Sequence, residues 1–260
     1  MDWTEDKMTF GDGNVLLRRA GSGAPLLILH EELGDLGPLR WQAELAGSRT
    51  VLHPYHPGFA KAPRVEWIAS VRDLAGYYAG WLRNRSLAPI DVVGVSFGGW
   101  IAAEMMAADP ALFRRVVLVS PLGIRPQPGE IFDLFQVKTP QYIAQSVASP
   151  ASTEEYAGLV ANAEAPEQFE AWEDAKAEVA RLAWEPYMFN TSLPSLLGLS
   201  SMPMTLIVGG RQDGIVPVSA LETYARAIGG AELLVYERCG HRPEIELRDR
   251  FVQDVKKFLA

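Results

Sequence analysis

Three residues of this sequence, Ser96, Asp213 and His241, are of the types that together activate a serine for attack on a carbonyl group. Ser96 lies in Gly94-Val95-Ser96-Phe97-Gly98, between the apolar run of residues 90–95 and a stretch rich in Ala and Met. A serine at so sharp a strand-to-helix turn has a strained backbone, and the glycines remove side chains that would collide there. The pattern predicts a nucleophilic hydroxyl that stands exposed above the sheet edge. The alternative is an ordinary Gly-Ser turn.

A serine hydroxyl needs a general base within hydrogen-bond reach, and the base needs an acid that orients it. Asp213 follows the strand expected at residues 203–209, and His241 follows the strand expected at residues 232–236. Asp213 has an alternative role as a turn carboxylate, and His241 as a loop or packing residue. Because residue type, chain order and strand context agree at three places, the sequence predicts a Ser-His-Asp triad.

The elements that must position these residues alternate between strands and helices. Apolar runs at residues 25–29, 50–52, 90–95, 115–119, 203–209 and 232–236 are expected strands, and residues 66–85 show helical spacing. This alternation predicts a mostly parallel sheet whose ligand crevice lies outside the carboxyl ends of the strands. Helical segments without strands follow between residues 122 and 201. We therefore expect a helical cap at 122–201, inserted into a core formed by 1–121 and 202–260.

With these motifs in this chain order, the sequence resembles the α/β-hydrolase superfamily, in its capped serine hydrolase branch. The resemblance covers nearly the whole length and is carried by residues 94–99, 213–217 and 240–244. It implies an α/β fold in which helices flank a mostly parallel central sheet and a helical cap is inserted. It also implies Ser96 as the nucleophile, His241 as the base and Asp213 as the partner of His241.

The expected oxyanion hole departs from the family pattern. Family members commonly carry His-Gly or small residues where this sequence has His30-Glu31-Glu32-Leu33-Gly34. One donor should be the backbone N–H of Phe97, and the other that of Glu31 or Glu32. A carboxylate aimed at the oxyanion would oppose catalysis, so we expect at least one glutamate to point away or to be paired. A contact with a polar or cationic substrate group is the further alternative.

Other reactive side chains have competing interpretations. His30, His53 and His56 lie at adjacent strand ends beside two glutamates, a set of residue types that can bind a metal. We expect local hydrogen bonds instead, with no metal and no cofactor. Cys239 is expected to be a packed thiol, since Ser96 already supplies the nucleophile.

The pocket beneath the cap decides the substrate. Most cap aromatics should only pack the cap against the core, while His30, Trp184 and Arg125 are candidate pocket residues. The main hypothesis is hydrolysis of a small or medium carboxylic ester, lactone or thioester through an acyl-enzyme.

Two alternatives remain open. Capped relatives with the same triad hydrolyse carbon–carbon bonds of diketone-like substrates, and those relatives often carry a tryptophan after the histidine and an arginine in the cap. Here Arg242 follows the histidine, which disfavours that activity, although Arg125 and Arg181 are candidate carboxylate anchors. The other alternative is a non-catalytic, ligand-binding protein on a hydrolase scaffold.

The composition of the chain argues against some classes of binding partner. A net charge of -8 over 260 residues argues against nucleic acid or an anionic membrane as the main partner. No apolar stretch reaches the length of a membrane span, and the acidic N-terminus is unlike a signal peptide. The single cysteine excludes an intrachain disulfide. We expect a cytoplasmic enzyme that acts on a small molecule. A homo-oligomer is left open.

Overall fold

One eight-stranded sheet runs through the molecule in the order β1-β2-β4-β3-β5-β6-β7-β8. The computed structural model describes residues 2–11, 13–34, 36–37, 39–60 and 62–260, apart from the side chains of Met8 and Val15. The strands are β1 Thr4–Phe10, β2 Gly13–Ala20, β3 Pro25–Leu29, β4 Thr50–Pro54, β5 Ile90–Val95, β6 Phe113–Val119, β7 Met204–Gly210 and β8 Glu232–Tyr236. The β1–β2 hairpin is antiparallel and pairs antiparallel with β4, and the strands from β4 to β8 are parallel. The predicted mostly parallel sheet is confirmed.

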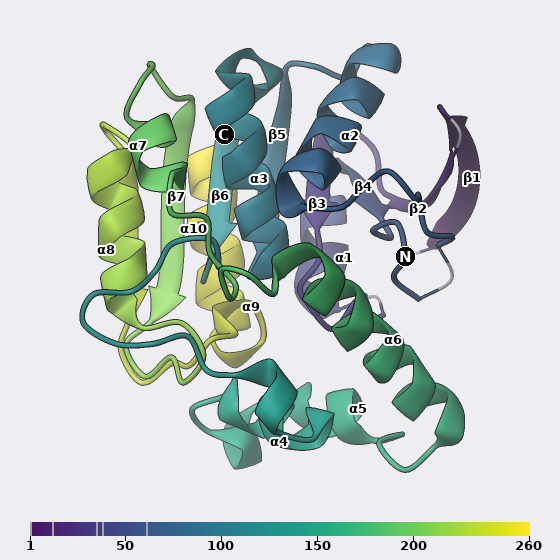
Figure 1. Ribbon diagram of the computed structural model, residues 1–260, viewed down its shortest axis with the longest axis vertical. Helices are drawn as coiled ribbons and strands as arrows, with labels where there is room; N and C mark the ends of the chain where they lie inside the picture. Colours follow the sequence, from purple (N-terminus) through teal and green to yellow (C-terminus); the bar gives the residue numbers. More distant parts are fainter. Residues whose placement is uncertain (1, 12, 35, 38, 61) are drawn as a thin grey trace.

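Helices cover both faces of this sheet. They are α1 Arg40–Ala46, α2 Val71–Asn84, α3 Phe97–Ala108, α8 Val218–Ala227, α9 Pro243–Glu246 and α10 Arg248–Leu259. The helices α2, α3 and α8 lie on one face, and α1 and α10 lie on the other (Figure 1). The fold is therefore the expected α/β sandwich of helices around a sheet.

The start of α2 differs from the sequence prediction. Helical spacing suggested a helix from residue 66, but α2 begins at Val71. The side chain of Ser70 accepts a hydrogen bond from the Asp73 N–H at 3.1 Å and so caps the helix there. Val65 and Ile68, which precede Ser70, are buried in the preceding turns instead, whereas Trp67 is exposed.

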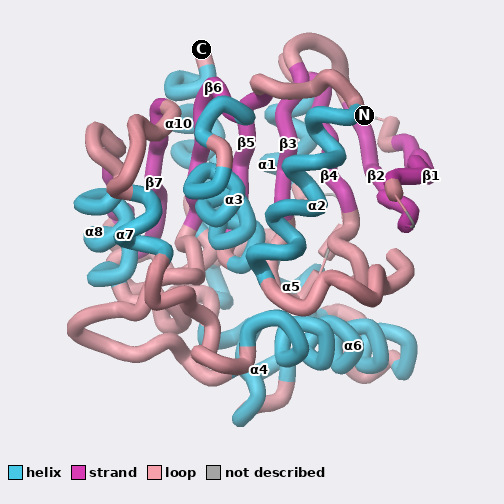
Figure 2. The backbone as a smooth tube through the Cα atoms, turned by 45° about the horizontal axis from the view of Figure 1, so that its top comes forward, coloured by secondary structure: helices cyan, strands magenta, loops and turns pink. Residues whose placement is uncertain are grey.

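The chain between β6 and β7 contributes helices and, among the described residues, no strand to the sheet. It contains η2 Leu134–Gln136, α4 Thr139–Gln145, η3 Pro150–Ser152, α5 Tyr156–Val160, α6 Pro166–Ala183 and α7 Leu193–Leu197. Figures 1 and 2 show α4, α5 and α6 below the carboxyl ends of the strands, whereas α7 lies beside α8 and α3. The boundaries of the cap at residues 122 and 201 stay a prediction, with α7 packed among the core helices. Within the described residues, the structure contains no helix both apolar and long enough to span a bilayer.

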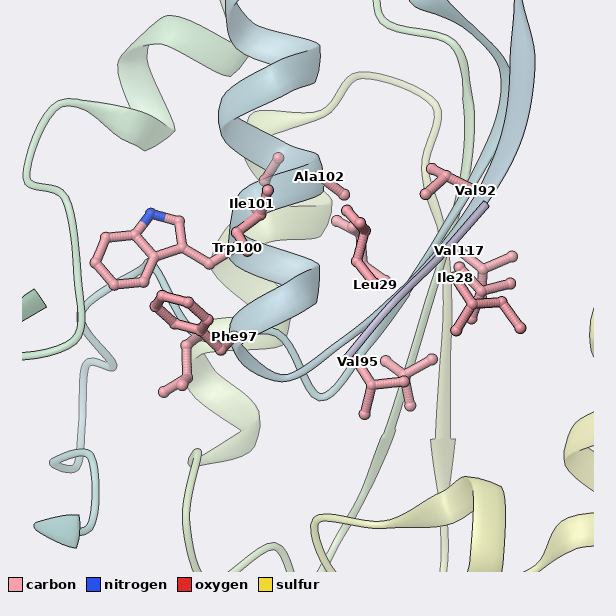
Figure 3. Close-up of a cluster of buried hydrophobic side chains, with 14 of the residues drawn as sticks. Ile28, Leu29, Val92, Val95, Phe97, Trp100, Ile101, Ala102 and Val117 are labelled. Atoms are coloured by element: carbon pink, nitrogen blue, oxygen red, sulfur yellow. The ribbon is translucent and has the colours of Figure 1, made fainter. Parts of the chain in front are cut away.

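The core is centred on β5, whose six residues are all buried. Helices on both faces remove it from water, which explains why it is apolar except for Asp91, whose carboxylate contacts Arg49 and Arg114. Figure 3 shows Val92, Leu29 and Val117 packed along the central strands, and Phe97 and Trp100 leaving the turn that follows β5. This packing holds the end of β5, where Ser96 begins the turn, in a fixed position.

Candidate active site

The turn from β5 into α3 is held in a strained conformation. Ser96 has φ 49° and ψ -108°, a region that residues with a side chain rarely adopt. A Cβ on Gly98 would lie 2.2 Å from the Leu29 carbonyl oxygen, and one on Gly94 would lie 2.5 Å from the Gly98 carbonyl oxygen. The predicted need for glycine on both sides of the serine is confirmed.

The structure brings the three predicted triad residues together. The His241 Nε2 atom lies 2.8 Å from the Ser96 Oγ atom, and the His241 Nδ1 atom lies 2.8 Å from the Asp213 Oδ2 atom. The other Asp213 oxygen accepts the N–H groups of Ile215 and Val216 at 2.8 Å each, which fixes the carboxylate in its loop. This geometry suits proton transfer from the serine to the histidine.

Burial and a neighbouring carboxylate shift the pKa of His241 in opposite directions. Burial lowers the pKa of the imidazole, but the charge and hydrogen bond of Asp213, helped by the Glu32 carboxylate, outweigh it and raise the pKa to about 9. The protonated form of the His241 imidazole is therefore stabilised, as a base that takes a proton from Ser96 would require. The backbone N–H of His241 also donates to the Ser146 carbonyl oxygen at 2.8 Å, which ties the histidine loop to the end of α4.

The side chain of Ser96 is not exposed, contrary to expectation. Its exposed fraction is 0%, and that of His241 is 1%. The segment around α4 lies below the carboxyl ends of the strands and contacts the loops carrying Glu32 and His241 (Figure 1). Contacts between segments so distant in the chain leave no local pattern in the sequence. A compound that reacts with Ser96 must therefore reach a hydroxyl that is shielded from water in this conformation.

The expected oxyanion donors are available. The backbone N–H groups of Phe97, Glu31 and Glu32 donate to no other described residue. Phe97 opens α3, where N–H groups lack a partner within the helix, and the helix dipole there favours negative charge. These groups therefore fit an oxyanion hole, a role that stays a prediction.

Residues 30–34, which are expected to supply an oxyanion donor, are called the oxyanion loop here. Both of its glutamates are buried and form hydrogen bonds, and we expected at least one of them to be paired. The Arg242 guanidinium lies 2.9 Å from Glu31 and 3.0 Å from Glu244. Glu32 instead accepts a hydrogen bond at 2.6 Å from the hydroxyl of Tyr142 on α4. The Glu31 carboxylate is thereby neutralised beside the oxyanion loop.

The Arg242 cluster was not foreseen as part of the site. Burial raises the pKa of Glu31 to about 7, against the opposing attraction of Arg242. The two residues are separated by 211 positions in the chain, so no local pattern could reveal the pair. Their contact joins the loop after β3 to the loop that carries His241.

The histidines beside the oxyanion loop form local hydrogen bonds. The backbone N–H of His56 donates to His30 Nε2 at 2.9 Å, and the Tyr78 hydroxyl lies 2.8 Å from His56 Nδ1. Gln42 lies 3.3 Å from His53 Nδ1, and burial lowers the pKa of His53 and His56 well below the usual range. No group of ligands suited to a metal occurs among the residues that the structure describes.

Cys239 is a packed thiol, as predicted. Its side chain is buried, and burial raises the pKa of its thiol far above the usual range. A thiol in this state is a poor nucleophile.

The candidate pocket residues lie in different places. His30 is buried beside His56, with its ring nitrogens engaged by backbone groups. Trp184 is 58% exposed and packs on Phe135, and Arg125 is exposed over the ring of Phe189. No contact joins Trp184 or Arg125 to the triad within the described part of the chain.

Arg181, the other candidate anchor for a substrate carboxylate, is already engaged. Its guanidinium contacts the buried Glu178 carboxylate and the Ile68 carbonyl oxygen. Arg181 therefore fastens α6 to the loop before α2, which does not suit it to bind a substrate anion.

The fold and triad agree with comparisons to known proteins. The family described as "Alpha/beta hydrolase family" matches residues 22–254. The chain belongs to this family. A solved α/β hydrolase, the 2-hydroxy-6-oxo-6-phenylhexa-2,4-dienoate hydrolase from Rhodococcus sp. strain RHA1, superposes with a TM-score of 0.79 at 20% identity. The superposition covers 99% of each chain.

Two relatives among the α/β hydrolases match by sequence. The 2-hydroxymuconate semialdehyde hydrolase of Pseudomonas sp. strain CF600 is 28% identical, over 94% of this chain and 89% of that protein. The 2-hydroxy-6-oxo-2,4-heptadienoate hydrolase of Pseudomonas putida strain F1 is 26% identical, over 94% and 92%. Neither name specifies an ester. The ester hypothesis therefore gains no support from them, and the alternative of carbon–carbon cleavage fits better.

Proposed function

We propose that this α/β hydrolase cleaves a carbon–carbon bond beside a ketone or aldehyde in a conjugated, diketone-like small molecule. The observation that carries the proposal is the match to the two relatives over nearly the whole chain. Their named substrates contain oxo or aldehyde, hydroxyl, alkene and carboxylate groups but no ester or amide. A hydrolase that acts on such a compound must break a carbon–carbon bond.

The triad supplies the chemistry in two halves. In the first half, the Ser96 oxygen attacks the carbonyl carbon while His241 takes the hydroxyl proton, and Asp213 holds the imidazolium. The N–H groups of Phe97 and of Glu31 or Glu32 stabilise the oxyanion. In the dienol substrates, the 2-hydroxyl proton moves before this attack to the carbon next to the attacked carbonyl, which makes that carbon tetrahedral and gives a diketone. The carbon–carbon bond then breaks, its electron pair passes into the conjugated 2-oxo-3-ene system of the leaving fragment as a dienolate, and His241 returns the proton to that fragment.

In the second half, water hydrolyses the acyl group left on Ser96. His241 takes a proton from the water, and the acid leaves as the serine regains its hydrogen. The same residues would hydrolyse an ester, because only the leaving group differs. The nature of that leaving group is therefore the point that an assay must decide.

The proposal is tested with both substrate classes. Purified protein is given 2-hydroxymuconate semialdehyde, 2-hydroxy-6-oxo-2,4-heptadienoate and short-chain 4-nitrophenyl esters. Loss of the conjugated chromophore and release of nitrophenol are followed, and products are identified by mass spectrometry. We expect a higher kcat/KM with the conjugated ketone or aldehyde than with any ester, and a loss of at least about 10³-fold in the Ser96→Ala variant.

A second serine serves as a matched control. Ser120 is also buried at the end of a strand, β6, and its hydroxyl has no partner among the described residues. The Ser120→Ala variant should keep its activity. Turnover of esters without turnover of the conjugated compounds would support the ester hypothesis. Equal activity of wild type and Ser96→Ala would reject the proposal that this protein is an enzyme acting through Ser96.

A further inference from the structure

Among the residues that the structure describes, the buried carboxylates are paired with basic side chains, with one exception. Asp91 contacts Arg49 and Arg114, Glu104 contacts Arg72, Glu178 contacts Arg64 and Arg181, Glu31 and Glu244 share Arg242, and Asp213 contacts His241. Glu32 is 0% exposed and has no basic partner among the described residues. Since an unpaired buried carboxylate is costly, Glu32 calls for an explanation.

One oxygen of the Glu32 carboxylate is unused. The Oε1 atom accepts the Tyr142 hydroxyl at 2.6 Å, whereas the buried Oε2 atom has no hydrogen-bond partner within the described chain. Buried polar atoms in folded proteins nearly always have a partner, from the protein or from a bound molecule. The neighbouring Glu31 shows the usual solution, because Arg242 binds it at 2.9 Å.

Glu32 lies between the triad and the segment that covers it. Its hydrogen bond reaches Tyr142 on α4, and its charge acts on His241, where it helps to raise the pKa of the imidazole. It also lies within the loop expected to supply an oxyanion donor. A substrate bound to Ser96 beneath α4 therefore passes close to the free oxygen of Glu32.

We propose that Glu32 is a specificity-determining residue, whose Oε2 atom accepts a hydrogen bond from a hydroxyl or ammonium group of the substrate beside the carbonyl that Ser96 attacks. The proposal rests on the proposed role of Ser96 as nucleophile and goes beyond it. A substrate carboxylate at this position would meet a like charge and be rejected. Arg242 does not relieve that repulsion, because Glu31 and Glu244 already occupy its guanidinium.

The test uses reversible ligands that bond to Ser96, so that it is independent of which bond the enzyme cleaves. Four phenylboronic acids of similar size carry ethyl, hydroxymethyl, aminomethyl or carboxyl groups at the 3-position. Their dissociation constants are measured by titration calorimetry for the wild type, for Glu32→Gln and for Glu31→Gln. The ethyl compound reports whether each variant retains an intact site.

Wild type should bind the hydroxymethyl or aminomethyl compound about 10-fold to 100-fold more tightly than the ethyl compound, as for a hydrogen bond to a charged group. The carboxyl compound should bind most weakly. Glu32→Gln should lose at least about 10-fold of the preference for the aminomethyl compound and gain affinity for the carboxyl compound. Glu31→Gln should keep the wild-type preference for the aminomethyl over the ethyl compound, because the Glu32 carboxylate is unchanged. The comparison for this variant is limited to these two compounds, because loss of the Glu31 charge frees part of the Arg242 guanidinium to attract a carboxylate.

Equal preferences in wild type and Glu32→Gln would overturn the inference, and so would tightest binding of the ethyl compound or no binding of any boronate to wild type. In those cases, Glu32 would only hold Tyr142 and α4 in place. Failure of the proposed function is seen separately, as absence of turnover of the conjugated compounds. The proposal that Glu32 selects substrates carrying a hydroxyl or ammonium group would hold even if the enzyme cleaved esters.

Discussion

Replacing Arg242 by methionine should destabilise the fold strongly and in a pH-dependent way. The guanidinium is 4% exposed and neutralises two buried carboxylates, Glu31 at 2.9 Å and Glu244 at 3.0 Å. Removing one partner of a buried ion pair typically costs about 3–5 kcal/mol, because the remaining charge has no compensation. Methionine keeps much of the side-chain volume, so the loss reports mainly on charge.

The pH dependence follows from the raised pKa of Glu31. This pKa is about 7 in the fold against 4.5 for an ordinary glutamate, so the fold binds the proton more tightly than the unfolded chain does. The stability associated with this proton is fully present below pH 4.5 and is lost as the pH rises through 7. Without Arg242 the pKa rises further, so the variant goes on losing stability above pH 7 at about 1.4 kcal/mol per pH unit.

The free energy of unfolding is measured by urea titration with tryptophan fluorescence at pH 6.0 and pH 8.5. We expect Arg242→Met to be about 2 kcal/mol more destabilising at pH 8.5 than at pH 6.0. Adding Glu31→Gln to the variant should remove most of that difference, since the titrating group is gone. A loss of stability that is the same at both pH values, or below about 1 kcal/mol, would refute the reasoning.

Three further predictions concern the site. The kcat/KM should rise with pH along a limb centred on about 9, because His241 acts as a base only when it is unprotonated; a pH–rate profile that is flat between pH 7 and 10 would contradict this. Gly98→Ala should lower the melting temperature by about 5–10 °C or prevent folding, because its Cβ would lie 2.2 Å from the Leu29 carbonyl oxygen; an unchanged thermal melt would show that the turn can adjust. Dialysis against EDTA should leave activity unchanged, because His30 and His56 bind backbone and tyrosine groups; recovery of lost activity with zinc would argue for a metal site.

The sequence predicts those parts of the site that local pattern determines. Strand β5 has the predicted bounds, because a strand covered by helices on both faces carries a largely apolar run. Ser96, Asp213 and His241 converge because the carboxyl ends of parallel strands meet at one edge of a sheet. The sequence also predicts the tight turn at Ser96, because glycine is required where neighbouring backbone leaves no room for a side chain.

The parts that depend on contacts between distant segments could not be predicted. Tyr142 reaches Glu32 across 110 positions, and no periodicity in either segment encodes that contact. The expectation that Trp184 lines a pocket came from its aromatic character alone, which suits packing and binding equally. At 58% exposure, it packs on Phe135 at the surface. Which small molecule fits beneath α4 depends on shape, and residue types do not specify shape.

The complete burial of Ser96 has a consequence for covalent labelling. A fluorophosphonate can reach the hydroxyl only in molecules whose α4 segment has moved away from the triad. The labelling rate should therefore rise with reagent concentration and then reach a plateau equal to the rate of opening. Reagents of different intrinsic reactivity should share that plateau. The maximal labelling rate of Ser96 therefore measures how fast the α4 segment moves away from it.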